Sequence, residues 1–156
     1  MTREPPLGSR GASRVVSWTL VGAQLALLAA LVARGVRGSW GIPATALLAA
    51  SGALAAWAVM TMGVRNLHPL PDVRPGATLR TRGAYRRLRH PMYSSLLLAS
   101  LACVLSRPDT VTVGLALALA LVLAAKSSRE ERMLCAAFPK YAEYRRRSWR
   151  FIPGVY

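Results

Sequence analysis

Acidic residues are scarce in this chain of 156 residues, which has six aspartates and glutamates against 21 lysines and arginines. The resulting net charge of +15 first suggests a nucleic-acid-binding protein. The basic residues, however, flank long apolar runs instead of lining one soluble face. Hydrophobic residues make up 53% of the chain and charged residues only 17%, which excludes a disordered chain and disfavours an ordinary soluble domain. A membrane protein explains both features better.

Residues that commonly carry metal or redox chemistry are also few. The two cysteines, Cys103 and Cys135, have neither metal-ligand spacing nor a disulfide framework, so we interpret both as packing residues. Of the two histidines, His68 stands alone before a proline and is interpreted as structural or interfacial. Two histidines and scattered carboxylates supply too few ligands, and we therefore expect no metal site. Walker loops, GxGxxG motifs and Ser-His-Asp sets are absent from the sequence.

Four apolar runs predict an all-α, polytopic membrane helical bundle. The runs 15–33 and 42–64 are long enough to cross hydrocarbon about 30 Å thick. The runs 92–105 and 111–125 are shorter, and we expect a helical hairpin that extends beyond them and turns at SRPDT. The last run alternates large and small residues as a strand does, but its leucines and alanines favour a helix.

Basic residues lie mainly on one side of these four spans. The N-terminus carries three, the segment 65–89 seven and the tail from Lys126 eight, which leaves three for the opposite side. Because positive residues stay inside, we expect an integral protein of a bacterial cytoplasmic membrane with both termini cytoplasmic. The alternative for the first run is a cleaved signal sequence, but the run is long and lacks a clear small-x-small cleavage site.

Three regions follow from this topology. Residues 1–14 are expected to form a mobile cytoplasmic N-terminus, and residues 15–64 two transmembrane helices. Residues 65–156 are expected to form the core that holds all the candidate chemistry, with a loop, the helical hairpin and C-terminal cytoplasmic helices.

The first polar stretch of this core is RNLHPLPDVRPGATLRTRGAYRRLRHPMY, which begins as a loop rich in proline and glycine. His90 and Tyr93 are three residues apart where the third span begins, so they share a helix face. Pro91 suits the first turn of that helix. The alternative is a polar helix cap at the headgroups.

The second polar stretch begins where the last apolar run ends. Lys126 and Glu130 lie on one helix face, and Glu130 and Glu131 form an adjacent acidic pair in a basic region. Glu131 points about 100° around the helix from Glu130, so we expect it to lie away from the face shared by Lys126 and Glu130 and to matter less. The alternatives are a snorkelling lysine and charge balance on a solvated helix face.

The end of the chain should contain a second, shorter helix. We expect the last span to continue as a helix until Pro139 interrupts it. Tyr141 and Tyr144 then lie three residues apart on the short helix that follows, and the alternative for them is interfacial anchoring. Trp149 falls near the predicted membrane interface, where indole rings prefer to lie.

Together, the two stretches resemble the isoprenylcysteine carboxyl methyltransferase family and its bacterial relatives, which include phospholipid N-methyltransferases. The resemblance rests on GAYRRLRHPMY at 83–93 and on EERMLCAAFPKYAEYRRR at 130–147, followed by FIP at 151–153. It covers roughly residues 63–153. Two positions depart from the family pattern, where proline and glycine are usual: Ala84 and Ser95.

The resemblance implies a membrane enzyme that transfers a methyl group from S-adenosylmethionine to a lipidic or hydrophobic acceptor. A prenylcysteine-like carboxylate and a phospholipid amine are both possible acceptors, and the partners expected are this acceptor and membrane lipids, not nucleic acid. Lys126 and Arg89 are implied as catalytic residues, with Lys126 also holding the acceptor. The residues implied around the cofactor are Ala77, Thr78, Leu79, Arg80, Tyr85, His90, Pro91, Met92, Tyr93 and Glu130.

These residue types suit methyl transfer. The reaction is an in-line displacement that needs positioned reactants and exclusion of water, but neither a metal nor a covalent intermediate. A carboxylate such as Glu130 can pair with the ammonium of the cofactor. Aromatic rings such as Tyr85 and Tyr93 can stack on adenine or face the sulfonium. A basic group such as Lys126 can hold an anionic acceptor.

Two other functions stay open at this point. Sterol reductases and related membrane reductases have a similar helical core but use NADPH, whereas the adjacent glutamates favour a cofactor that carries an ammonium group. A non-catalytic membrane or lipid-binding protein built on a decayed enzyme core is the second. Binding assays with both cofactors separate the three functions.

Overall fold

The computed structural model describes residues 7–63 and 79–155, with side chains described from residue 15 onward. Within these ranges the chain is helical and forms no strand beyond isolated bridges. This confirms the all-α prediction. The elements in chain order are α1 (Leu7–Gly35), α2 (Ile42–Met62), the short 3₁₀ helix η2 (Gly83–Arg86), α3 (Pro91–Ser106), α4 (Thr110–Ala137) and α5 (Tyr141–Arg146).

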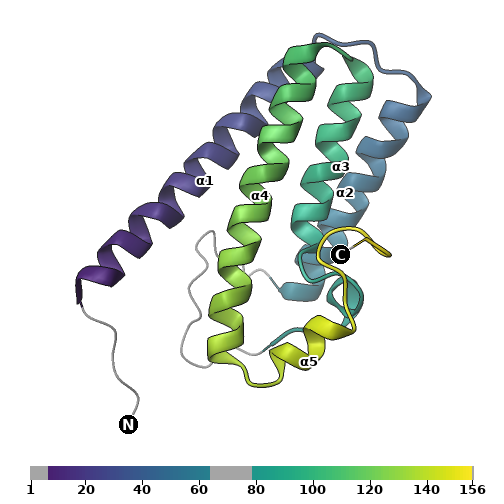
Figure 1. The fold of residues 1–156 in the computed structure, drawn as a ribbon. Coiled ribbons are helices and arrows are strands. Elements are labelled where there is room, and N and C mark those ends of the chain that lie inside the picture. Colours follow the sequence, from purple (N-terminus) through teal and green to yellow (C-terminus); the bar gives the residue numbers. More distant parts are fainter. Residues whose placement is uncertain (1–6, 64–78, 156) are drawn as a thin grey trace.

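The four long helices form a bundle in which α3 packs mainly against α2, and α4 packs against α1 and α3 (Figure 1). The connections from α1 to α2 and from α3 to α4 lie at one end of the bundle. The opposite end carries η2, α5 and the C-terminal segment, beside the start of α3 and the end of α4. We call this second end the polar end, because most of the buried charged side chains described below lie there.

Three helices are long and apolar enough to cross a membrane: Val15–Gly35 of α1, Ile42–Met62 and Thr110–Ala137. Large apolar side chains on these helices, such as Leu25, Met60 and Leu121, point outward and are exposed. The chain is therefore an integral membrane protein with a helical bundle. The helix α3 has 16 residues and spans only about 24 Å.

The end of α4 agrees with the sequence prediction, whereas the start of α1 differs from it. The helix α4 ends at Ala137, as predicted, because Pro139 cannot continue it. The helix α1 begins at Leu7, inside the segment expected to be a mobile tail, because adding residues to an existing helix costs little compared with nucleation. Cys103 is buried as expected, but the prediction of a packing role for Cys135 is wrong, because its side chain is exposed.

At the end opposite the polar end, Asp109 caps α4 by accepting a hydrogen bond from the Thr112 amide at 3.0 Å. Arg34 of α1 contacts both carboxylate oxygens of Asp109 at 2.6 Å. The amide of Thr112 and the guanidinium of Arg34 hold the pKa of Asp109 well below its usual range. This ion pair joins α1 to the α3–α4 hairpin and so fixes how the bundle closes.

Candidate active site

His90 is the centre of a buried polar cluster at the polar end, immediately before α3. Its side chain is 7% exposed, and a separate carboxylate lies beside each ring nitrogen. Nδ1 is 3.4 Å from Glu130 Oε2, and Nε2 is 3.3 Å from Glu131 Oε1. Burial lowers the pKa of His90, but the two carboxylates outweigh burial and raise the pKa above its ordinary value. The site therefore favours an imidazolium.

Both glutamates thus face the cluster, and the expectation that Glu131 points away from it is wrong. The Glu131 side chain is 7% exposed and that of Glu130 18%, so neither belongs to a solvated helix face. The separation of 100° is real, but His90 lies between the two carboxylates. Arg89 and Arg150, which lie on segments distant from α4 in sequence, supply cations to Glu131 at 2.8 and 3.7 Å.

Tyr93 connects the two residues of α4 that were expected to share a face. Its hydroxyl donates a hydrogen bond to Glu130, and its ring stacks on His90 with a centroid distance of 5.4 Å and an angle of 8°. The Lys126 ammonium lies 5.3 Å from the centroid of the same ring. The Glu130 carboxylate and the Lys126 ammonium, one helical turn apart on α4, therefore both contact the Tyr93 side chain.

Lys126 is buried, with 5% exposure, and it does not snorkel to solvent. Its ammonium donates a hydrogen bond to Gln24 Oε1 of α1 at 3.0 Å. Gln24 is a residue that the sequence analysis missed. The available signal was a single amide in an otherwise apolar run, because a polar side chain inside a membrane helix is costly unless it has a partner.

Arg89 donates hydrogen bonds to one carboxylate and to two backbone carbonyls. Its side chain is buried, with Nε donating to Glu131 at 2.8 Å. One terminal nitrogen donates to the carbonyl oxygens of Arg145, at 2.9 Å, and Ser148. Arg89 therefore ties α4 and the end of α5 to the start of α3.

Two tyrosines join η2 to α5. The Tyr144 hydroxyl donates to the carbonyl oxygen of Tyr85 at 2.6 Å. Burial, with smaller contributions from Tyr144 and Glu130, raises the pKa of Tyr85 to about 12. Burial likewise raises the pKa of Tyr144 to about 12, so both hydroxyls are neutral near pH 7. Tyr144 and Tyr141 are buried, which excludes the interfacial anchoring considered for them.

The remaining predicted cofactor residues are placed less closely. Ala77 and Thr78 lie outside the described residues. Leu79 is half-buried and Arg80 is exposed, both just before η2, and no described contact joins either to Glu130. Two further residues have packing contacts: Pro91, buried in the first turn of α3, and Met92, which packs against the cluster of Ala58, Ala84 and Tyr85.

The sequence model of the isoprenylcysteine carboxyl methyltransferase (ICMT) family matches residues 44–136, more than half of the chain. The chain belongs to this family. The resemblance seen in the sequence is thereby confirmed. The match includes nearly all of α2 and α4 and the whole of η2 and α3, and with them His90, Tyr93, Lys126 and Glu130. It does not reach α1 or α5.

A curated relative is the cobalt-zinc-cadmium resistance protein CzcN of Cupriavidus metallidurans, which is 43% identical over 83 residues. The aligned region is 53% of this chain but only 38% of the relative. Among the residues that the structure describes, no group of three or more His, Cys, Asp or Glu side chains could hold a metal ion.

The parts of the site outside the ICMT match come from the two ends of the chain. Gln24 of α1 reaches Lys126, while Ser148 and Arg150 of the C-terminal segment reach Arg89 and Glu131. Leu88 and Trp149 form a parallel bridge that holds this segment beside the start of α3. Nothing in the sequence spacing indicated these C-terminal contacts. In this ICMT-family chain, residues outside the matched core therefore supply part of the hydrogen bonding and charge pairing of the site.

Proposed function

We propose that this ICMT-family chain transfers a methyl group from S-adenosylmethionine to a lipidic or hydrophobic acceptor. The observation that carries the proposal is the placement of Tyr93 between Glu130 and Lys126 at the polar end of an apolar bundle. This arrangement puts a carboxylate, an aromatic face and an ammonium in one partly closed site. The apolar helix surfaces beside it suit an acceptor that stays in the membrane.

The side chains present suit S-adenosylmethionine. The Glu130 carboxylate keeps 18% exposure and can accept the ammonium of the cofactor, while Tyr85, His90 and Tyr93 offer aromatic faces. When bound, the cofactor supplies an electrophilic methyl group on a sulfonium. The stretch formed by Ala77, Thr78, Leu79 and Arg80 is proposed to complete the cofactor site.

Lys126 is proposed to hold the acceptor as an anion. A carboxylate acceptor forms its new C–O bond while the C–S bond breaks and its electron pair stays on sulfur, so no proton has to be removed. Lys126 then acts by charge and position alone, with Gln24 fixing the direction of the ammonium. A phospholipid amine would instead have to lose a proton, and the Lys126 ammonium would not attract it.

Arg89, expected as a catalytic residue, is proposed to act through Glu131. Its Nε and one terminal nitrogen donate to that carboxylate and to backbone carbonyls, and we assign it a positioning role. Glu131 in turn faces His90, which stacks on Tyr93. The Arg89–Glu131 pair therefore fixes the His90 ring, and through it the Tyr93 ring, against which the cofactor would lie.

We further propose that the polar end faces the cytoplasm. Thirteen of the basic residues with described side chains lie at or near this end, from Arg80 to Arg89 and from Lys126 to Arg150, and three lie at the other end: Arg34, Arg37 and Arg107. Residues 1–14 and the C-terminus then lie in the cytoplasm, residues 15–64 contribute two spans, and residues 65–156 form the catalytic core.

Cofactor binding tests the proposal. We expect S-adenosylmethionine or its demethylated product to stabilise the purified protein, by about 2.7 kcal/mol at 100 times its dissociation constant. NADPH should give no such stabilisation. A thermal shift with NADPH alone would favour the reductase function, and a shift with neither cofactor would favour a non-catalytic protein.

A further inference from the structure

A polar cavity lies beside η2, and neither Glu130 nor Lys126 lines it. Its volume is about 690 Å³, within the usual range for sites that bind small molecules. It is open to the surface and is lined by η2 and its flanking residues, by α5 and by the C-terminal segment. The residues that line it are Thr81, Arg82, Gly83, Arg86, Arg87, Tyr144, Arg147 and Trp149.

Positive charge dominates this cavity. Four of the eight lining residues are arginines, and none is acidic. Among the described carboxylates, Glu143 alone forms an ion pair with one of the four, with Arg147 at 3.2 Å. The Tyr144 hydroxyl is occupied with the carbonyl oxygens of Tyr85 and Leu88. The excess positive charge of the lining therefore favours binding of an anion.

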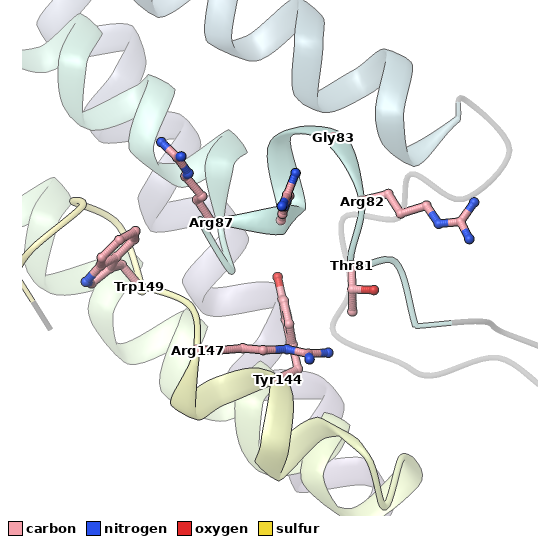
Figure 2. A pocket seen from close by; sticks show the side chains of 8 residues that line it. Thr81, Arg82, Gly83, Arg87, Tyr144, Arg147 and Trp149 are labelled. Carbon is pink, nitrogen blue, oxygen red and sulfur yellow. The ribbon is translucent and has the colours of Figure 1, made fainter.

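The four arginines that line the cavity are exposed, and they do not form one tight cluster. Figure 2 shows Tyr144 of α5 pointing toward the η2 turn and Arg147, which directly follows α5, extending beside Tyr144. Arg82 and Arg87 extend from the η2 turn to opposite sides. This spread suits an extended polar group with one delocalised charge better than a single small ion. Arginine also recognises phosphate oxygens well, because its planar fork presents several donors.

The cavity lies at the depth at which the membrane helices end. Gly83 of η2 adopts a positive φ of 54°, and a β-carbon there would lie 2.6 Å from Thr61 Oγ1 near the end of α2. The turn is thus pressed against the end of one span and leads directly into α3. Trp149 lines the cavity, and indole rings favour the headgroup region. At the end of a membrane span, the anionic groups beside the protein are phospholipid headgroups.

We propose that the cavity between η2 and α5 binds the phosphodiester headgroup of an anionic phospholipid. Arg82, Arg86, Arg87 and Arg147 supply the charge, and Trp149 contacts the interfacial part of the lipid. A net anionic headgroup is preferred to a zwitterionic one, because the lining has no carboxylate to pair with a choline or an ethanolamine. Since Glu130 and Lys126 do not line the cavity, the inference is independent of the proposed methyl transfer.

The test is a titration of purified full-length protein in mixed micelles that contain phosphatidylglycerol or phosphatidylcholine, read as the shift of the thermal midpoint. A third titration uses inorganic phosphate at the same ionic strength. The cavity variant is Arg86→Gln/Arg147→Gln. The matched control, Arg132→Gln/Arg146→Gln, removes the same charge from exposed arginines that do not line the cavity.

We expect phosphatidylglycerol to bind the wild type and the control variant alike. Each cavity arginine near the membrane surface contributes about fivefold, so the cavity variant should bind about 25-fold more weakly. Arg86→Lys/Arg147→Lys should restore most of the affinity. Equal weakening of the cavity and control variants would overturn the proposal, because only overall charge would matter. Equal binding of phosphatidylcholine, or equally tight binding of inorganic phosphate, would overturn the assignment to an anionic lipid.

Discussion

The Lys126 ammonium donates a hydrogen bond to the amide oxygen of Gln24 at 3.0 Å, across 102 positions of sequence, and so joins α4 to α1. The side of the site proposed for the acceptor is therefore built partly by a helix outside the ICMT match. The cofactor side, with Glu130, Tyr93 and His90, lies within the match. The two halves of the proposed reaction can consequently be separated by mutation.

Lys126→Met keeps the apolar stem of the side chain and removes its charge. We expect kcat/KM for the acceptor to fall by about 2–4 kcal/mol in transition-state stabilisation, while affinity for S-adenosylmethionine stays within about threefold. Lys126→Arg should retain much of the activity. The matched control is Lys140→Met, at the only other lysine, which is exposed. Wild-type rates for Lys126→Met would mean that Lys126 is only an anchor.

Glu130→Gln and Glu131→Gln should have different effects, because their partners differ. Loss of the charge on Glu130 should weaken S-adenosylmethionine binding about tenfold to a hundredfold, as expected for a hydrogen bond to a charged group worth roughly 1.5–3 kcal/mol. Glu131→Gln removes the partner of a buried arginine and should lower the free energy of unfolding by about 3–5 kcal/mol. Isothermal binding and thermal denaturation distinguish the two. Negligible effects of both changes would contradict this account of the cluster.

Stability should decrease as the pH rises through the pKa of His90. In the folded protein Glu130 and Glu131 raise that pKa above the unfolded value of about 6.5, whereas burial opposes them. The stabilisation from the imidazolium is therefore fully present below about pH 6.5 and is lost on the alkaline side of the folded pKa. The thermal midpoint of His90→Gln should depend less on pH between about 6 and 9 than that of the wild type; identical pH profiles would exclude His90 as the titrating group.

Cysteine labelling in intact cells checks the proposed orientation. The exposed Cys135 is at the polar end, whereas Cys103 is buried. A membrane-impermeant maleimide should leave the wild type unlabelled until the membrane is opened, and it should label Arg37→Cys at once. Immediate labelling of Cys135 would place the polar end outside the cytoplasm and away from the cytosolic cofactor.

The long-range part of the site explains what the sequence could and could not predict. Local rules were enough for the apolar helices, for the turn at Asp109 and for the end of α4 before Pro139. The shared face of Lys126 and Glu130 followed from helical spacing. By contrast, the pairing of Arg89 with Glu131 spans 42 positions and that of Tyr144 with Tyr85 spans 59. The first contact depends on how α4 packs beside the start of α3, and the second on how α5 packs on η2. No local pattern specifies either arrangement.

The sequence also predicted the wrong neighbourhood for Glu131. Helical geometry correctly turned it away from Glu130, but a helix wheel does not show what fills the space on that side. Here His90 lies between both carboxylates, and Arg150 follows from the C-terminal segment. A pair of adjacent acids in a basic chain can therefore act on one buried group from two sides.

The most direct test of the central claim is transfer of a labelled methyl group from S-adenosylmethionine into the lipid extract of membranes that contain the chain. We predict labelled product with the wild type and Lys140→Met, and at least tenfold less with Glu130→Gln or Lys126→Met. Label released by mild alkali would identify a carboxyl ester, the acceptor favoured by Lys126, whereas alkali-stable label would identify an amine. Label no higher than in membranes without the chain, from protein shown to be folded and supplied with fractionated host lipids, would contradict methyl transfer as its function.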